Sequence, residues 1–402
     1  MRRATFVFIF ITVLLDMLAL GIIAPVFPRL VVELKGGDTA SAAAMFGVFG
    51  SVWAAMQFLC APLIGAVSDR FGRRAVILVS TLGLGLDYIV MALAPTLGWL
   101  FVSRVISGVT AASFATAFAY VADVTPPERR AGQYGLLGTA FGIGFILGPA
   151  VGGLLGDVQL RLPFWVAAGL SLLGTAYGYF LLPESLPRER RAPFEWAKAN
   201  PVGSLGFLRA NTVLFALAAA AFLYRIAHDA LPSLFVLYGD YRYGWSAHTV
   251  GFVLTAVGAA SMIVQGVLVG PAVARLGERR AMLTGFGFGA AAFAVYALAP
   301  TGMLFLAGIP LSALFGFSYP AMQGLLTRLV SPTEQGRLQG ALASVMGIAG
   351  VVAPTLFTQV FSAAIAPDRA VHLPGAAFLL AAALLVMAAG VAGRATRIAV
   401  IA

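Results

Sequence analysis

Apolar runs of about twenty residues recur along this 402-residue chain, and they limit what it can fold into. A helix that crosses a bilayer needs about 20 mostly apolar residues. Hydrophobic residues make up 60% of the chain and charged residues only 10%, so a single water-soluble core would leave much of this apolar surface uncovered. The sequence therefore predicts an all-α membrane protein.

The apolar runs predict twelve transmembrane helices. The first run is too long for the apolar part of a signal peptide and no small-residue cleavage site follows it, so we expect it to remain as the first membrane helix. The predicted helices cover residues 6–27, 42–67, 75–94, 97–121, 131–156, 162–182, 211–238, 246–273, 281–299, 302–327, 336–364 and 373–393.

Lysine and arginine residues give the expected orientation. Of the 26 in the chain, 19 fall in segments on the side of the two termini and 5 in segments on the other side, while Arg104 and Arg225 lie inside predicted helices. Because basic loops stay in the cytoplasm, both termini are predicted to be cytoplasmic. The net charge of +10 is spread between the apolar runs rather than gathered on one face, so no nucleic-acid partner is predicted.

The two halves of the chain repeat one another. The string ALAPT at residues 92–96 recurs at 297–301, an offset of 205 residues that also aligns Gly72 with Gly277. Parallel repeats of this kind build secondary transporters whose halves rock about a central site. We therefore predict two six-helix bundles and a cytoplasmic linker, at residues 1–182, 211–402 and 183–210 respectively.

A turn with an unusual density of charge lies between the second and third predicted helices. Gly72 lets the chain reverse tightly, and Gly65 is expected to let another helix approach closely. Asp69 is placed to accept hydrogen bonds from an arginine or from a helix N-terminus. We interpret this turn as a conformational latch made by Gly65, Asp69, Arg70, Gly72, Arg73 and Arg74.

Three ionisable residues are predicted to lie deep in the membrane. With a rise of about 1.5 Å per residue, Asp16, Asp87 and Arg104 all fall near the midplane. Each such charge costs about 2.5–3.5 kcal/mol to insert, so intramembrane charges are usually functional. A carboxylate there binds either a proton or a cationic group of a substrate, and antiport requires that exclusivity. The alternative is a structural ion pair that locks the three helices together.

Other polar residues fall within the predicted helices. Arg225, His228 and Asp229 share one face of the seventh helix, where they are candidates for a proton or substrate site. The alternatives are that Arg225 and Asp229 neutralise one another within the helix, that the residues form a vestibule gate near the outer rim, or that their side chains snorkel to the membrane surface. Gln57 on the second helix is a candidate for substrate contact, with a hydrogen bond between helices as the alternative role.

Three motifs resemble those of a known family. The turn has the pattern G-x-x-x-D-R-x-G-R-R at 65–74, which resembles the loop signature of the major facilitator superfamily. Arg104-x-x-x-Gly108 is similar to that family's proton-coupling arginine motif. The fifth predicted helix carries a pattern similar to the family's antiporter motif, in Gly144, Gly148, Pro149, Gly152 and Gly153.

Two further segments resemble one branch of that superfamily. LLDMLALGIIAPVFP at 14–28 and LDYIV at 86–90 closely resemble the tetracycline-efflux branch, whose aspartates on the first and third helices correspond to Asp16 and Asp87. The best-known members of the branch also carry a histidine on the eighth helix and an aspartate on the ninth. This sequence has Ser261 and Gly289 at those places.

The resemblance implies a proton-coupled antiporter that exports amphipathic drugs, with tetracyclines as one candidate, through the bacterial inner membrane by alternating access. It implies a monomer whose partners are the lipid bilayer, protons and a small-molecule drug or metabolite. No cofactor or metal site is expected, and Mg²⁺ would enter only as part of a chelated substrate.

Two alternatives remain at this stage. The first is an uptake symporter of the same fold for a metabolite, although the glycine motif of the fifth helix favours export. The second is an integral-membrane enzyme or a scaffold. The sequence contains no nucleotide-binding, metal-binding or catalytic motif, so an enzyme is not expected.

Overall fold

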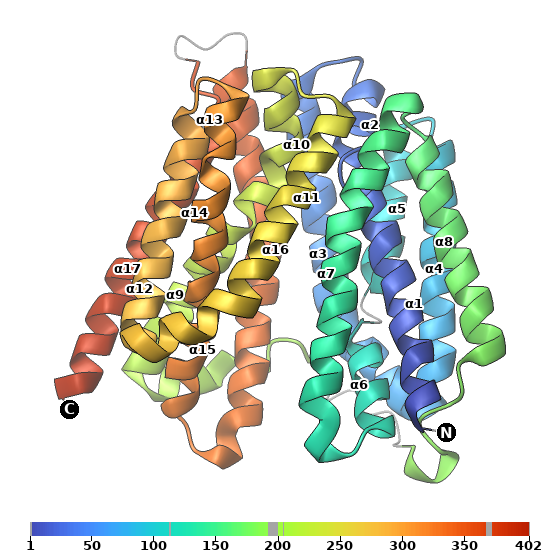
Figure 1. Ribbon diagram of the computed structural model, residues 1–402, viewed down its shortest axis with the longest axis vertical. Helices are drawn as coiled ribbons and strands as arrows, with labels where there is room; N and C mark the ends of the chain where they lie inside the picture. The colour runs from blue at the N-terminus through green and yellow to red at the C-terminus, as the bar shows by residue number, and fades with distance from the viewer. Residues whose placement is uncertain (1, 112–113, 192–199, 204, 367–371, 402) are drawn as a thin grey trace. The chain divides into compact units, whose positions relative to one another are not determined.

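The computed structural model describes residues 2–111, 114–191, 200–203, 205–366 and 372–401, and Figure 1 shows their arrangement. Every regular element within these residues is helical, and none of the described residues is in a strand. This confirms the prediction of an all-helical chain.

The helices of the first half precede the linker between Leu182 and Asn211. They are α1 (Arg2–Ile23), α2 (Phe27–Leu34), α3 (Thr39–Phe71), α4 (Arg73–Leu93), α5 (Leu97–Ala111), α6 (Phe114–Val124), α7 (Pro127–Val158) and α8 (Leu162–Leu181). The described residues of the linker include the short 3₁₀ turns η1 (Arg188–Arg190) and η3 (Leu205–Ala210).

The helices of the second half are more often interrupted. They are α9 (Thr212–His228), α10 (Ala230–Tyr243), α11 (Ala247–Ile263), η4 (Val264–Leu268), α12 (Val269–Leu298), α13 (Gly302–Leu306), α14 (Gly308–Leu314), η5 (Phe315–Phe317), α15 (Ser318–Arg328), η6 (Pro332–Glu334), α16 (Gln335–Ile365) and α17 (Ala376–Ile401).

Eleven helical stretches among the described residues are long and apolar enough to cross a membrane. One of them, Ala247–Leu298, has 52 residues and contains both of the predicted helices 246–273 and 281–299. A straight helix of that length would span about 78 Å, more than twice the hydrocarbon thickness of about 30 Å. Its helical conformation is broken at Gly277, where φ is 75° and ψ is 157°. The count of twelve crossings therefore stays a prediction.

Prolines explain four interruptions of the membrane helices. A proline has no N–H, and its ring crowds the carbonyl of the residue four positions earlier, so a helix tends to stop there. Pro62, Pro149 and Pro354 lie inside continuous helices instead. The interruptions and the prolines that follow them are Ala24 with Pro28, His228 with Pro232, Leu306 with Pro310 and Gly316 with Pro320.

The contacts divide the chain into two compact units. Unit 1 consists of Met1–Gly37, Val52–Asn200 and Trp245–Thr255, and unit 2 of Asp38–Ser51, Pro201–Gly244 and Ala256–Ala402. This division departs from the predicted domains at three places: the start of α3 packs within unit 2, the start of α11 packs within unit 1, and the predicted linker 183–210 is divided between the units after Asn200. The two six-helix bundles stay a prediction.

Each unit has its own helical core. In unit 1, α1 packs along α7 and α8, and α4 packs along α5 and α8 (Figure 1). In unit 2, α17 packs along α9 and α12, and α12 packs along α15 (Figure 1). The helix that carries Asp16 is therefore held mainly by α7 and α8.

The glycine motif of α7 lets this helix contact the backbone of α1. A Cβ atom on Gly148 would lie 2.6 Å from the Cα of Gly21, and one on Gly152 would meet the carbonyl of Ile22. Small residues permit this close approach of membrane helices, which here holds the segment of α1 just after Asp16. The residues predicted as an antiporter motif thus have a packing role, and their part in antiport stays a prediction.

We expect Gly148→Ala to destabilise the protein by about 1–3 kcal/mol, because the added methyl group meets backbone rather than a movable side chain. Thermal unfolding in detergent measures the effect. Gly138→Ala is the matched control on the same helix, since nothing lies within 4 Å of the position of its Cβ. Equal melting temperatures for the two variants would contradict this account of the α1–α7 contact.

Candidate functional site

Two of the predicted intramembrane charges form an ion pair in unit 1. Asp87 projects from α4 with no exposed surface, and Arg104 projects from α5 and is also buried. The Arg104 Nη2 atom lies 3.7 Å from the Asp87 Oδ2 atom. Charges that are buried in a low-dielectric environment need such a partner, so the pair explains how both helices tolerate an ionised group.

The guanidinium of Arg104 has three further contacts. Its Nη2 atom lies 3.3 Å from the sulfur of Met91 and 3.4 Å from the hydroxyl of Ser103. The guanidinium carbon lies 4.4 Å from the centre of the Phe27 ring, a cation–π contact. These weak contacts hold the guanidinium of Arg104 in place, and Asp87 is its acidic partner in the ion pair.

The carboxylates of Asp16 and Asp87 are under-satisfied. Both side chains are buried. Within the described residues, neither carboxylate oxygen of Asp87 has a hydrogen-bond partner, and the Oδ1 atom of Asp16 has none either. The Ser103 and Ser107 hydroxyls lie near Asp87, but that of Ser107 donates to the Ser103 carbonyl at 3.0 Å. Buried polar atoms are nearly always paired, so the unpartnered oxygen of Asp16, which lines a cavity, is available to a proton or a ligand group, whereas the charge of Asp87 is met by Arg104.

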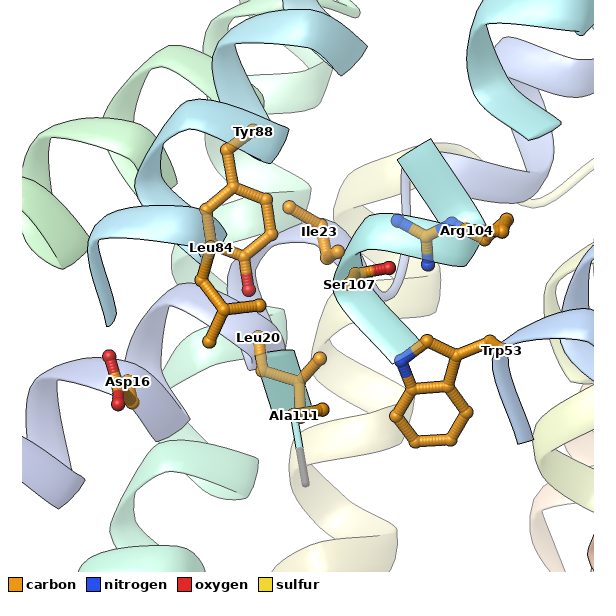
Figure 2. A pocket seen from close by; sticks show the side chains of 9 residues that line it. All are labelled: Asp16, Leu20, Ile23, Trp53, Leu84, Tyr88, Arg104, Ser107 and Ala111. Atoms are coloured by element: carbon orange, nitrogen blue, oxygen red, sulfur yellow. The ribbon is translucent and has the colours of Figure 1, made fainter. Parts of the chain in front are cut away.

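Asp16 and Arg104 line the same cavity, which Figure 2 shows from close by. Its accessible volume is about 20 Å³, which is room for about one water molecule in this conformation. Its lining is mostly apolar with a few polar groups. The lining residues are Asp16, Leu20, Ile23, Trp53, Leu84, Tyr88, Arg104, Ser107 and Ala111.

Tyr88 links the three predicted charges. It follows Asp87 on α4, lines the cavity and lies within electrostatic range of Asp16, Asp87 and Arg104. Asp16, Asp87 and Arg104, which were expected near one depth, thus lie in one region of unit 1. Asp16 and Arg104 line the cavity, and Asp87 pairs with Arg104 without being among the lining residues.

Several lining residues were not identified from the sequence. Ser107 follows Arg104 by three positions, so helical spacing was an available signal for it. Tyr88 directly follows Asp87, and helical spacing gave no signal for it. Trp53 lines the cavity from α3, whereas Gln57 is half-buried one turn further along and is not among the lining residues. The proposed substrate contact of Gln57 stays a prediction.

The charged turn between α3 and α4 is held by contacts inside unit 1. Arg73 pairs with Asp69 at 2.6 Å and, through its Nε atom, with Asp123 on α6 at 3.2 Å. Its backbone N–H donates to the Oε1 of Glu184, which lies just after α8, at 2.9 Å. The turn therefore fastens α3 and α4 to α6 and to the end of α8.

The remaining residues of the turn have smaller contacts. Arg74 lies over the Tyr179 ring of α8, and Arg70 lies over the Phe71 ring. Nothing lies within 4 Å of the position of a Gly65 Cβ, so the close helix expected at that glycine is not seen. The role of this turn as a latch stays a prediction.

Gly72 has a backbone conformation that only glycine readily adopts, with φ 107° and ψ 154°. Gly277 has nearly the same conformation, with φ 75° and ψ 157°. The 205-residue offset found in the sequence therefore aligns two glycines that provide the same kind of backbone conformation, one in each half of the chain.

The predicted charges of the seventh helix lie in unit 2, at the end of α9. Arg225 Nε donates to Asp229 Oδ2 at 2.8 Å, and His228 Nδ1 lies 3.3 Å from Asp229 Oδ1. These three residues form one cluster, separate from the residues that line the unit 1 cavity.

We expect a double-mutant cycle to show strong coupling between Asp87 and Arg104. Asp87→Asn leaves the Arg104 charge buried without its partner and should cost about 3–5 kcal/mol of stability. The variant that also carries Arg104→Gln should be less destabilised than the two single effects added together, as thermal unfolding in detergent would show. Additive effects would contradict the assigned ion pair.

We expect Gly72→Ala to destabilise the turn by about 1–3 kcal/mol, because alanine is strained in this conformation and its Cβ would meet the Glu184 carboxylate. Gly65→Ala is the control, since its Cβ would point into open space on the same helix pair. Unfolding temperatures measure both. A Gly72→Ala variant as stable as the control would show that the turn tolerates a side chain at this position.

Comparisons with known proteins agree with the architecture. Residues 9–354 and 217–397 match the sequence profile of the Major Facilitator Superfamily. The chain is 39% identical to the class C tetracycline resistance protein of Escherichia coli, over 88% of each chain. It is 36% identical to the class G tetracycline resistance protein of Vibrio anguillarum, over 90% of this chain and 91% of that one.

Solved structures show the same fold at lower identity. The crystal structure of the nucleoside transporter NupG superposes with a TM-score of 0.80, covering 98% of this chain and 99% of that one. Because the two sequences are only 15% identical, this likeness concerns the fold alone.

Proposed function

Because this chain belongs to the Major Facilitator Superfamily, we propose that it is a proton-coupled antiporter that exports amphipathic drugs from a bacterial cell. It is a membrane transporter and not an enzyme. Tetracyclines are the first candidate substrates, because relatives with 39% and 36% identity over most of their length are tetracycline resistance proteins.

The observation that carries the proposal is the under-satisfied buried carboxylate of Asp16, which lines the same cavity as Arg104. Asp16 lines a cavity and has an oxygen without a hydrogen-bond partner among the described residues. A proton or a cationic group of a drug would satisfy that oxygen, but not both at once. Asp87, paired with Arg104, would respond to the same exchange through the shared neighbour Tyr88.

The proposed topology has twelve crossings with both termini in the cytoplasm. The 52-residue stretch Ala247–Leu298 is long enough for two crossings, and the break at Gly277 is where the chain would reverse. The equivalent reversal at Gly72 separates α3 from α4. The positive-inside distribution of arginines supports this orientation in the inner membrane.

The proposed mechanism is alternating access by a monomer. The two compact units would move against one another. The contacts of the Asp69–Arg73 turn with Asp123 and Glu184 lie inside unit 1, so they would keep that unit together as it moves. Loading with drug on the cytoplasmic side would displace a proton from Asp16, and a proton taken up on the outer side would release the drug.

We expect Asp16→Asn to abolish drug-dependent proton movement, because the amide cannot take up or release the proton. The assay is purified protein in liposomes with an internal pH indicator and tetracycline as the drug. Asp157→Asn, at the exposed end of α7, is the matched control and should keep wild-type exchange.

Three outcomes are distinguishable. Loss of exchange in Asp16→Asn with a normal elution profile supports the assignment. Wild-type exchange in that variant would refute the role of Asp16. Proton movement in the same direction as the drug, in the unmodified protein, would replace export by antiport with uptake by symport.

A further inference from the structure

A second polar centre lies deep within unit 2, where a membrane helix is broken. Asp229 is the junction between α9, of 17 residues, and α10, of 14 residues, so it lies near the middle of the 32-residue stretch Thr212–Tyr243. Pro232 removes the hydrogen bond that the His228 carbonyl would receive in a continuous helix. Discontinuous helices with polar groups at the break are typical of transporter binding sites.

The charged groups at the break have a defined arrangement. The Asp229 carboxylate is largely buried and contacts both Arg225, at 2.8 Å, and His228, at 3.3 Å. By contrast, the Arg225 side chain is 41% exposed and that of His228 is 50% exposed. The Asp229 carboxylate is therefore buried, and it holds in place the side chains of Arg225 and His228, which are more exposed.

The guanidinium of Arg225 keeps donors available for a ligand. Its hydrogen bond to Asp229 uses the Nε atom. Among the described residues no other acidic group pairs with Arg225, so its two terminal amino groups can bind a planar acidic group in the paired geometry that arginine favours.

Aromatic rings form a wall beside these charges. The Tyr224 ring lies 5.0 Å from that of Phe315 and is stacked with that of Tyr319 at 5.9 Å and an interplanar angle of 17°. The His228 ring lies 6.1 Å from Phe315. Gln323 donates to the Tyr319 hydroxyl at 2.7 Å, while its own buried Oε1 has no partner among the described residues.

The backbone is irregular at three places around this wall. Phe315 belongs to the 3₁₀ segment η5, and its neighbour Gly316 lies against Gln265 and Val264 of the π-helical segment η4. The third irregularity is the α9–α10 break itself. Non-helical backbone at membrane depth is tolerated where it is buried in protein or lines a cavity, and π-helical segments are frequent at functional sites.

We propose that Arg225, held by Asp229 and flanked by His228 and the rings of Tyr224 and Phe315, is a second binding subsite that takes the acidic edge of a planar aromatic substrate. The exposed His228 ring, backed by the buried rings of Tyr224 and Phe315, would lie against the flat face of the substrate, and Arg225 would pair with its ionised oxygen. This inference rests on the proposed transport function, because it assumes that the chain carries a small molecule.

The two centres differ in the charge that they offer. The unit 1 cavity is lined by Asp16, whose Oδ1 atom has no partner among the described residues, and this suits a proton or a cationic group. The unit 2 subsite offers exposed donors of Arg225, which suit an anionic group.

The test compares two dyes that share a xanthene ring system but differ in charge. Fluorescein carries an acidic group, and rhodamine 123 is cationic. Fluorescence polarisation with the purified full-length protein in detergent gives the affinity for each. We expect Arg225→Gln to weaken fluorescein binding about tenfold or more while rhodamine 123 binding changes by less than about twofold.

Three variants serve as controls. Arg225→Lys keeps the charge but loses the paired geometry, so it should retain part of the fluorescein affinity. Arg242→Gln, an arginine near the end of α10, should bind both dyes as the unmodified protein does. Asp157→Asn, at the exposed end of α7 and outside both centres, should also bind both dyes as the unmodified protein does. The liposome assay on the unmodified protein keeps the two proposals apart: proton exchange without fluorescein binding would reject this subsite alone, and fluorescein binding without proton exchange would reject the antiport alone.

Three results would overturn the proposal. The first is unchanged fluorescein affinity in Arg225→Gln, and the second is no fluorescein binding by the unmodified protein. The third is an equal loss of both dyes in Arg225→Gln, because a charge-selective subsite must distinguish them; such a result would assign Arg225 and Asp229 to a structural ion pair.

Discussion

The cost of holding an ionised side chain away from water governs the polar architecture of this chain. Asp87 and Arg104 offset that cost by forming an ion pair between two helices in unit 1. Arg225 and Asp229 offset it by forming an ion pair at the break of one helix in unit 2. Asp16 is the exception, because its oxygen has no partner among the described residues and faces a cavity. A buried carboxylate without a partner in the protein can be neutralised by a proton or by a cationic group of a bound molecule. The proposed exchange of protons for drug follows from that property.

The same constraint acts on the backbone. Prolines stop the helices at His228 and at Gly316, and both interruptions lie beside the aromatic wall of unit 2. Glycines at positions 72 and 277 adopt one backbone conformation at equivalent places in the two halves. Helix breaks are thus concentrated where the chain reverses or where polar groups gather, while the packing glycines of α7 keep α1 in close contact elsewhere.

Much of the fold was predictable because membrane helices leave a strong signal in apolar run length. The depth of Asp16, Asp87 and Arg104 followed from a constant rise per residue, and their common neighbourhood agreed with it. The break at Asp229 was missed, although Pro232 was the available signal, because run length does not register a helix that stops and restarts. Partners that are distant in sequence, such as Glu184 for the charged turn, depend on tertiary packing and had no local signal.

Transport driven by an imposed pH gradient tests the central claim most directly. In liposomes that contain the purified protein and an acidic interior, tetracycline should accumulate against its own gradient, and it should leave again when an ionophore removes the pH difference. Accumulation to the same level with and without the gradient would contradict the claim that buried carboxylates exchange protons for the drug.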